Sequence, residues 1–174
     1  MTTQQTIAIK NNVLKCSYIC GGITDRTLQE LGCTEEIVRE LCESKRLRKV
    51  PVQIKNPDGT FRKITVYEDM ALNKTRPQAC LTEWSATLIW EKNRCYLKFK
   101  DTAREWFDES SIESYCKKMP TDVASKQRPG MMFYSESGLI GVFFDRRRKG
   151  MTEEERSAAS QRFQLDKCIV AVSH

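Results

Sequence analysis

Apolar residues recur at intervals of three and four along the first 45 positions, and this spacing predicts three short helices. The first covers residues 13–20 and ends at a pair of glycines. Thr24 and Thr34 are suited to cap the second and third, because each hydroxyl can accept a hydrogen bond from the turn that follows. The chain is therefore expected to be helical as far as a basic segment at residues 45–49.

The pattern then changes from helical spacing to extended segments. Residues 50–54 and 61–67 are suited to two strands, on either side of Asn56-Pro57-Asp58-Gly59, which has the composition of a tight turn. Three short helices followed by a two-stranded hairpin is the order of a winged helix-turn-helix. We expect this domain to occupy residues 1–72.

The second half mixes both patterns and predicts a small α/β domain over residues 73–174, so that the whole chain is of the α+β class. Ser110 and Thr152 are expected to cap the last two of its helices. Helical spacing predicts helices over residues 77–91, 101–107, 111–119 and 152–164. Alternation and apolar runs predict strands over residues 94–100, 131–135, 139–145 and 167–172.

The composition fits a globular protein of one domain or two small ones. The 174 residues are 40% hydrophobic and 30% charged, and no uncharged run reaches the roughly 18 residues of a membrane span. No basic segment precedes an apolar stretch at the N-terminus, which predicts a cytoplasmic location. The eight cysteines are irregularly spaced and are expected to be free thiols in a reducing compartment.

Residues suited to catalysis or to a cofactor are scarce. The only histidine is His174, which argues against Ser-His-Asp and Cys-His catalysis. Neither a GxxxxGK[ST] loop nor a GxGxxG motif is present. The spacing from Cys16 to Cys20 matches none of the usual zinc patterns. We therefore expect a binding protein that is not an enzyme and has no cofactor or metal ion.

Four segments carry a resemblance to a known family: residues 13–49, the helix after Thr75, Arg128-Pro129-Gly130-Met131-Met132-Phe133 and the strand at 139–145. With them the chain resembles the plasmid replication-relaxation family, in which a winged helix precedes a domain similar to the restriction-endonuclease core. The resemblance implies that this core is degenerate here. Gly130 replaces the first acidic residue of its metal site, and Asp145-Arg146-Arg147 is a reduced form of the second. It thus implies a nuclease-like fold that binds without cleaving.

The basic residues point to double-stranded DNA as the partner. Lys and Arg outnumber Asp and Glu by 29 to 23, for a formal charge of +6, and basic segments can neutralise phosphates. We expect a non-catalytic DNA-binding accessory or regulatory protein of a mobile genetic element, a plasmid or phage; such units commonly bind as homodimers. The predicted contact residues are Arg39, Lys45, Arg46, Arg48, Lys49, Lys55, Arg62, Lys63, Arg146, Arg147, Arg148 and Lys149.

Two alternatives stay open. The helix expected at residues 34–46 has four glutamates against three basic residues, which is unusual for reading bases and would suit a protein partner. Carboxylates can imitate phosphates, so this favours an anti-defence inhibitor, similar to an anti-CRISPR protein, that blocks a nuclease or its nucleic acid. The other alternative is a small metal-dependent nuclease, which would need Asp145 to converge with Asp122 or Glu136.

Overall fold

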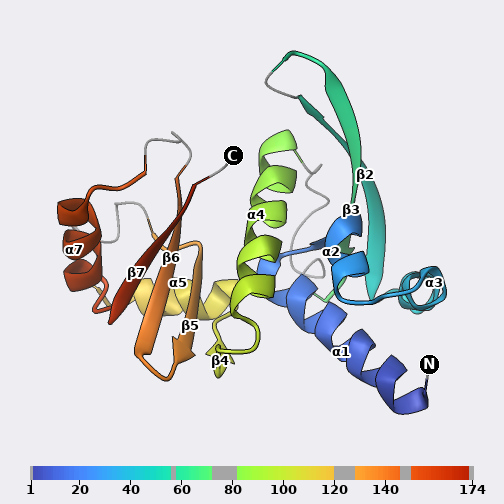
Figure 1. The fold of residues 1–174 in the computed structure, drawn as a ribbon, viewed down its shortest axis with the longest axis horizontal. Coiled ribbons are helices and arrows are strands. Elements are labelled where there is room, and N and C mark those ends of the chain that lie inside the picture. The colour runs from blue at the N-terminus through green and yellow to red at the C-terminus, as the bar shows by residue number, and fades with distance from the viewer. Residues whose placement is uncertain (1, 56–57, 72–81, 120–127, 146–149, 173–174) are drawn as a thin grey trace. The chain divides into compact units, whose positions relative to one another are not determined.

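The computed structural model describes residues 2–55, 58–71, 82–119, 128–145 and 150–172, which form six helices and two sheets. This confirms the predicted α+β class. The chain divides into two compact units, unit 1 (Met1–Leu97) and unit 2 (Lys98–His174), which run from blue to green and from green to red in Figure 1. None of the helices in these ranges combines the length and the apolar character that crossing a bilayer requires.

Unit 1 begins with three helices, α1 (Thr3–Cys20), α2 (Asp25–Glu30) and α3 (Glu35–Glu43). The predicted caps Thr24 and Thr34 are confirmed, since each side chain accepts a hydrogen bond from a backbone N–H of the first turn. The first helix begins ten residues earlier than predicted. Thr2 and Gln5 form a reciprocal capping box there, which satisfies two backbone donors at the true start of the helix.

The predicted hairpin is confirmed and is longer than expected. Its strands are β2 (Leu47–Lys55) and β3 (Phe61–Asp69), and the short β1 (Ile23–Thr24) adds to β3 on the other side. All three are antiparallel, in the order β1-β3-β2. Because side chains alternate along a strand, Val52, Ile54, Ile64 and Val66 share one face of the hairpin.

Helix α4 (Glu83–Phe99) packs on that face, where Ala86 and Ile89 join the apolar cluster of β2 and β3. Figure 1 shows α4 beside the hairpin, on the side opposite α3. One helical face holds Ala86, Ile89, Asn93 and Tyr96 at intervals of three and four, all of them buried. The strand predicted over 94–100 is therefore wrong: the apolar residues there continue a helix.

Asn93 explains why α4 belongs to unit 1. Its side chain is fully buried and bonds twice to the backbone before α2: the amide nitrogen donates to the Gly22 carbonyl at 3.0 Å, and the amide oxygen accepts from the Thr24 N–H at 2.9 Å. Unit 1 consequently ends at Leu97, whereas we expected a domain boundary at residue 72.

Unit 2 is built on a four-stranded mixed sheet, β4-β5-β6-β7. The predicted strands after residue 130 and the predicted cap Thr152 are confirmed, and Glu155 completes a capping box with Thr152. Helix α7 (Glu153–Arg162) links β6 to β7, which makes these two strands parallel, while the other pairs are antiparallel. The strands are β4 (Glu105–Trp106), β5 (Met131–Ser135), β6 (Gly138–Asp145) and β7 (Lys167–Val172).

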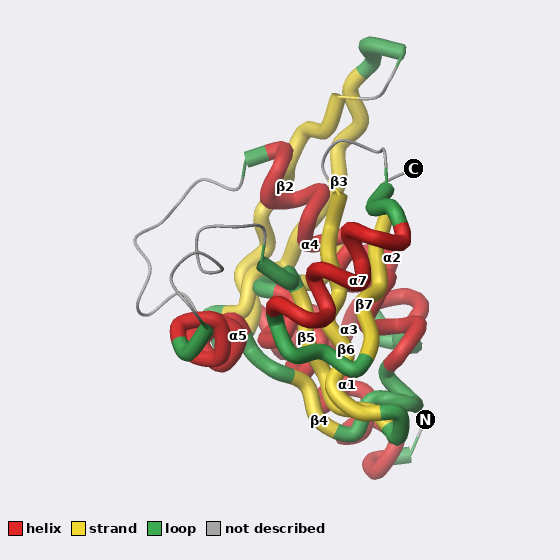
Figure 2. The backbone as a smooth tube through the Cα atoms, turned by 90° about the vertical axis from the view of Figure 1, so that its left-hand side faces the viewer, coloured by secondary structure: helices red, strands yellow, loops and turns green. Residues whose placement is uncertain are grey.

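Two predictions in unit 2 are wrong. Residues 101–107 do not form a helix, because β4 pairs with β5 there and the Trp106 ring lies 4.6 Å from the buried ring of Phe133. Helix α5 (Glu109–Lys117) is capped by Asp108, whose carboxylate accepts from the Ser111 N–H at 2.7 Å, and not by Ser110. In Figure 2 α7 crosses β5, β6 and β7, and α5 shares one apolar cluster with α7 and the sheet.

Candidate nucleic-acid interface

Positive charge is concentrated in one segment of unit 1. Residues 45–67 contain seven lysines and arginines and a single acid, Asp58, so their net charge equals the +6 of the whole chain. The segment runs from the end of α3 through the hairpin. A single supersecondary element therefore carries the excess of positive charge.

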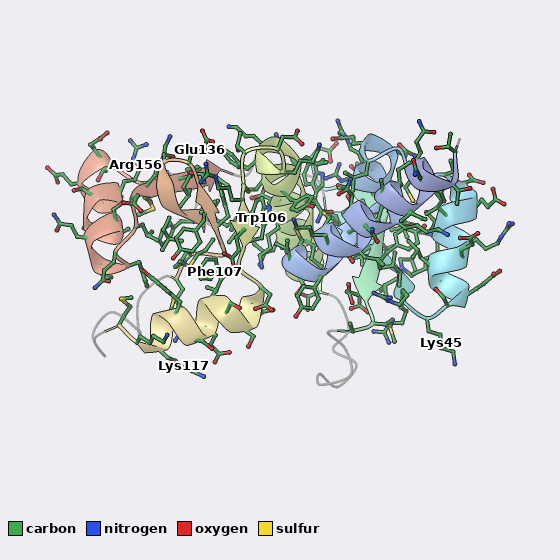
Figure 3. The ribbon with its side chains drawn as sticks, turned by 90° about the horizontal axis from the view of Figure 1, so that it is seen from below. Lys45, Trp106, Phe107, Lys117, Glu136 and Arg156 are labelled. Atoms are coloured by element: carbon green, nitrogen blue, oxygen red, sulfur yellow. The ribbon has the colours of Figure 1, made fainter. Side chains whose placement is uncertain are left out.

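The end of α3 is shaped by a left-handed residue. Lys45 has φ of 55°, its N–H donates to the Cys42 carbonyl, and the Arg46 N–H donates to the Leu41 carbonyl, which is a Schellman arrangement. It ends the helix and turns the chain into β2. The side chains of Lys45 and Arg46 are exposed, and Lys45 points away from the ribbon (Figure 3).

The hairpin has two faces, because its strands alternate. We call the face that packs on α4 the α4 face, and the opposite one, which carries Lys49, Gln53, Phe61, Lys63 and Tyr67, the α3 face. Helix α3 lies next to its base. Burial raises the pKa of the Tyr67 hydroxyl, and the neighbouring Cys42 thiol of α3 adds to the rise.

Lys49 and Lys63 are exposed on the α3 face, and Gln53 lies directly opposite Lys63 in the strand register. Lys49 also lies near Cys42 of α3, because its positive charge acts on the Cys42 thiol. Burial raises the pKa of that thiol, and the charge of Lys49 opposes the rise. The side chains at the end of α3 and those on this face can therefore meet one extended polyanion.

Arg48 and Arg62 lie on the α4 face instead. The Arg48 guanidinium pairs with the Glu68 carboxylate, with Nε 2.9 Å from Oε2, and the Glu68 side chain is only 8% exposed. The Arg62 guanidinium lies over the Trp90 ring of α4 at 5.2 Å from its centre, and Arg94 approaches the same ring at 5.6 Å. The structure thus separates these two predicted contacts from Lys49 and Lys63.

Helix α3 itself remains acidic. Arg39 is the one residue of α3 that was predicted to contact DNA. Its Nε lies 4.0 Å from Oε1 of Glu43, and both side chains are about two-thirds exposed. Lys10 of α1 pairs with Glu40. Glu35 and Glu36 are exposed in the first turn, where they suit the helix dipole. Because α3 exposes carboxylates along its length, its surface is poorly suited to lie against phosphates.

Phe61 is a part of this surface that the sequence analysis did not single out. It begins β3 on the α3 face, two residues before Lys63, and is 65% exposed. An apolar residue next to the turn of a lysine-rich hairpin is the signal that could have drawn attention to it. Arg146 to Lys149 and the side chain of Lys55 lie outside the described residues, so their contacts stay predictions.

An aromatic ring lies against Gly130, where the resemblance implies that an acidic residue has been replaced. A Cβ atom added at Gly130 would lie 2.5 Å from the Phe144 ring, which is 7% exposed. Glu136 lies in an exposed turn and pairs with Arg104 at 2.9 Å. Asp122 and the Asp145 side chain lie outside the described residues, among which no group of three or more His, Cys, Asp or Glu could hold a metal ion.

Comparison of the chain with protein-family models, with curated proteins and with solved structures returns no match.

Proposed function

We propose that the chain is a non-catalytic, cytoplasmic DNA-binding protein, an accessory or regulatory protein of a mobile genetic element. One observation carries the proposal: Lys49, Gln53 and Lys63 are exposed on the α3 face of the hairpin. Lys45 and Arg46, at the C-terminal end of α3, are exposed as well. Contacts of lysine and arginine with phosphates supply most sequence-independent affinity for DNA. The hairpin would hold duplex DNA on this face.

The arrangement of unit 1 supports this proposal. Its elements follow the order helix, strand, helix, helix, strand, strand, with β3 between β1 and β2. This order suits a winged helix-turn-helix, in which α3 would be the recognition helix and the β2–β3 hairpin the wing. The acidic charge of α3 favours an approach by the C-terminal end of that helix and by the wing, and not along the helix.

Unit 2 supports the non-catalytic part of the proposal. Its antiparallel strands β4, β5 and β6, followed by α7 and the parallel β7, suit the restriction-endonuclease-like core that the plasmid replication-relaxation resemblance implies. In such a core an acidic residue would follow Pro129, but the Phe144 ring takes up the space beside Gly130. The seven described cysteines are free, which suits a reducing compartment.

The test is a titration of duplex binding with salt, from about 50 to 200 mM, where phosphate-driven affinity falls steeply. Lys49→Ala/Lys63→Ala should lower the slope of log affinity against log salt by about 2, since each lost phosphate contact removes about 0.9. Lys117→Ala/Lys118→Ala removes the same charge from α5 and its end, and should leave the slope unchanged. No duplex binding at low salt would refute the proposal.

The acidic surface of α3 favours one second candidate, an anti-defence inhibitor that docks on the basic groove of a nuclease. Glu35 and Glu36 expose two adjacent carboxylates that could take the place of phosphates. The measurement is nuclease cleavage with and without the protein. Inhibition that disappears in Glu35→Gln/Glu36→Gln, in a protein that binds no DNA, would support this candidate over the first.

A further inference from the structure

On the α3 face the wing extends beyond the part of unit 1 that covers it. Along β3 the side chains change from buried at residues 66–69, through half-buried at 64–65, to exposed at 61–63. Three residues of strand span about 10 Å. Figure 1 shows this end of the hairpin reaching past α3 and the other elements around its base. On the α3 face this end of the hairpin is therefore free to meet a groove, whereas on the α4 face Ile54 is buried and the Arg62 side chain lies over Trp90.

Phe61 has the most exposed large apolar side chain in the described part of the chain, at 65%. The fold gains little from it there, since a largely exposed ring buries little apolar surface. Lys55 faces it in the strand register, and in the adjoining turn the Thr60 N–H donates to the Asp58 carboxylate at 2.9 Å. The hairpin thus presents an apolar ring on the lysine-bearing face, next to its turn.

We propose that Phe61 inserts as a wedge into the minor groove of duplex DNA and partly unstacks a base step. The inference rests on the proposed function. The ring lies at the outer end of β3, one residue beyond Arg62, whose side chain still contacts Trp90, and the minor groove it would enter is about 7.5 Å deep. Lys63 and Lys49, on the same face, then lie toward the phosphates that border the groove.

Apolar side chains that enter the minor groove kink the duplex at the step they unstack. Steps from a pyrimidine to a purine, TA above all, unstack most easily. The wing should therefore favour duplexes that contain TA steps over duplexes of uniform stiff sequence, without a hydrogen bond to any base edge.

The test uses the full chain and a short duplex in which the adenines of the TA steps are replaced by 2-aminopurine, whose fluorescence rises when it unstacks. The wild-type protein should raise this fluorescence. Phe61→Ala should abolish the rise and weaken binding about tenfold, with an unchanged salt slope, because no charge is lost. Phe61→Leu should keep part of both effects.

Ile7→Ala is the matched control, since Ile7, on α1, is the one large apolar side chain besides Phe61 that is more than half exposed among the described residues. It should change neither binding nor fluorescence. If Phe61→Ala binds and unstacks DNA as the wild type does, the wedge is refuted while DNA binding stands. If Phe61→Ala weakens binding to a single strand as much as to the duplex, stacking on unpaired bases replaces insertion. If the wild type binds no duplex, the proposed function fails.

Discussion

Replacing Asn93 by alanine should destabilise unit 1 more than any other single polar substitution in α4. The substitution removes both bonds of a fully buried amide, and it leaves the Gly22 carbonyl and the Thr24 N–H without partners inside the core. Each buried polar group left unsatisfied costs about 1–3 kcal/mol. We expect the free energy of unfolding to fall by about 3–4 kcal/mol in total.

The assay is urea unfolding of the full chain, followed by tryptophan fluorescence and by hydrogen exchange in β1 and α4. For an m-value near 2 kcal/mol/M, the expected loss lowers the midpoint by about 1.5–2 M. Asn12→Ala, at an exposed position of α1, is the control and should shift the midpoint little. Equal shifts for Asn93→Ala and Asn12→Ala would show that these two bonds do not hold α4 to the unit.

Asn93→Asp separates the two hydrogen bonds. At neutral pH the carboxylate can still accept from the Thr24 N–H, but it faces the Gly22 carbonyl oxygen and cannot donate to it. Burial and this carbonyl favour the protonated form, so the folded pKa should exceed the unfolded value. The variant should therefore be closest to the wild type at about pH 4 and lose stability as pH rises. A constant difference between pH 4 and pH 7 would contradict this reasoning.

Three further predictions concern other parts of the chain. Gly130→Asp should lower the free energy of unfolding by about 1–3 kcal/mol, because the new side chain meets the Phe144 ring. The double variant Gly130→Asp/Phe144→Ala should recover part of this loss, and the urea midpoints of both variants measure it. Burial raises the pKa of the Cys16 thiol well above its usual value, so stability should be retained below about pH 8.5 and fall as pH rises further; Cys16→Ala should flatten that fall. Lys63→Ala should lower the salt slope of duplex binding by about 1, whereas Arg62→Ala, whose side chain lies over Trp90, should leave it unchanged.

Features that depend on neighbouring residues were predictable from the sequence. Thr24, Thr34 and Thr152 cap helices because a hydroxyl one residue before a helix can accept from its first turn. The hairpin could be located from its turn and the extended segments on either side of it. In each case the groups that decide the conformation lie within a few residues of one another.

Features that depend on distant residues were not predictable. The partners of Asn93 lie 69 and 71 positions earlier in the chain, so nothing around residue 93 indicates that α4 completes unit 1. The apolar residues at 94–100 suit a strand as well as a helix, and packing decided between them. We expected a domain boundary at residue 72 for the same reason: nothing near that residue indicates that α4 packs on the hairpin.

The candidate site could be predicted only in part. The sequence locates the basic residues, but the face on which each one lies follows from the strand register. Arg62 and Lys63 are neighbours in the sequence, yet one lies over Trp90 and the other on the opposite face. Arg48 is held by Glu68, twenty positions further on. A count of basic residues cannot separate those that are held by the protein from those that are free to bind.

The two-residue period of β3 also sets which changes of length natural variants of this hairpin can tolerate. One residue inserted between Lys63 and Val66 would turn Val66 toward the α3 face and bring polar side chains against Ala86 and Ile89 of α4. An insertion at the turn would leave both faces intact. Variation in length should therefore collect at the tip, while the strands keep their alternation, and a change at the tip would alter the reach of the hairpin without disturbing the core.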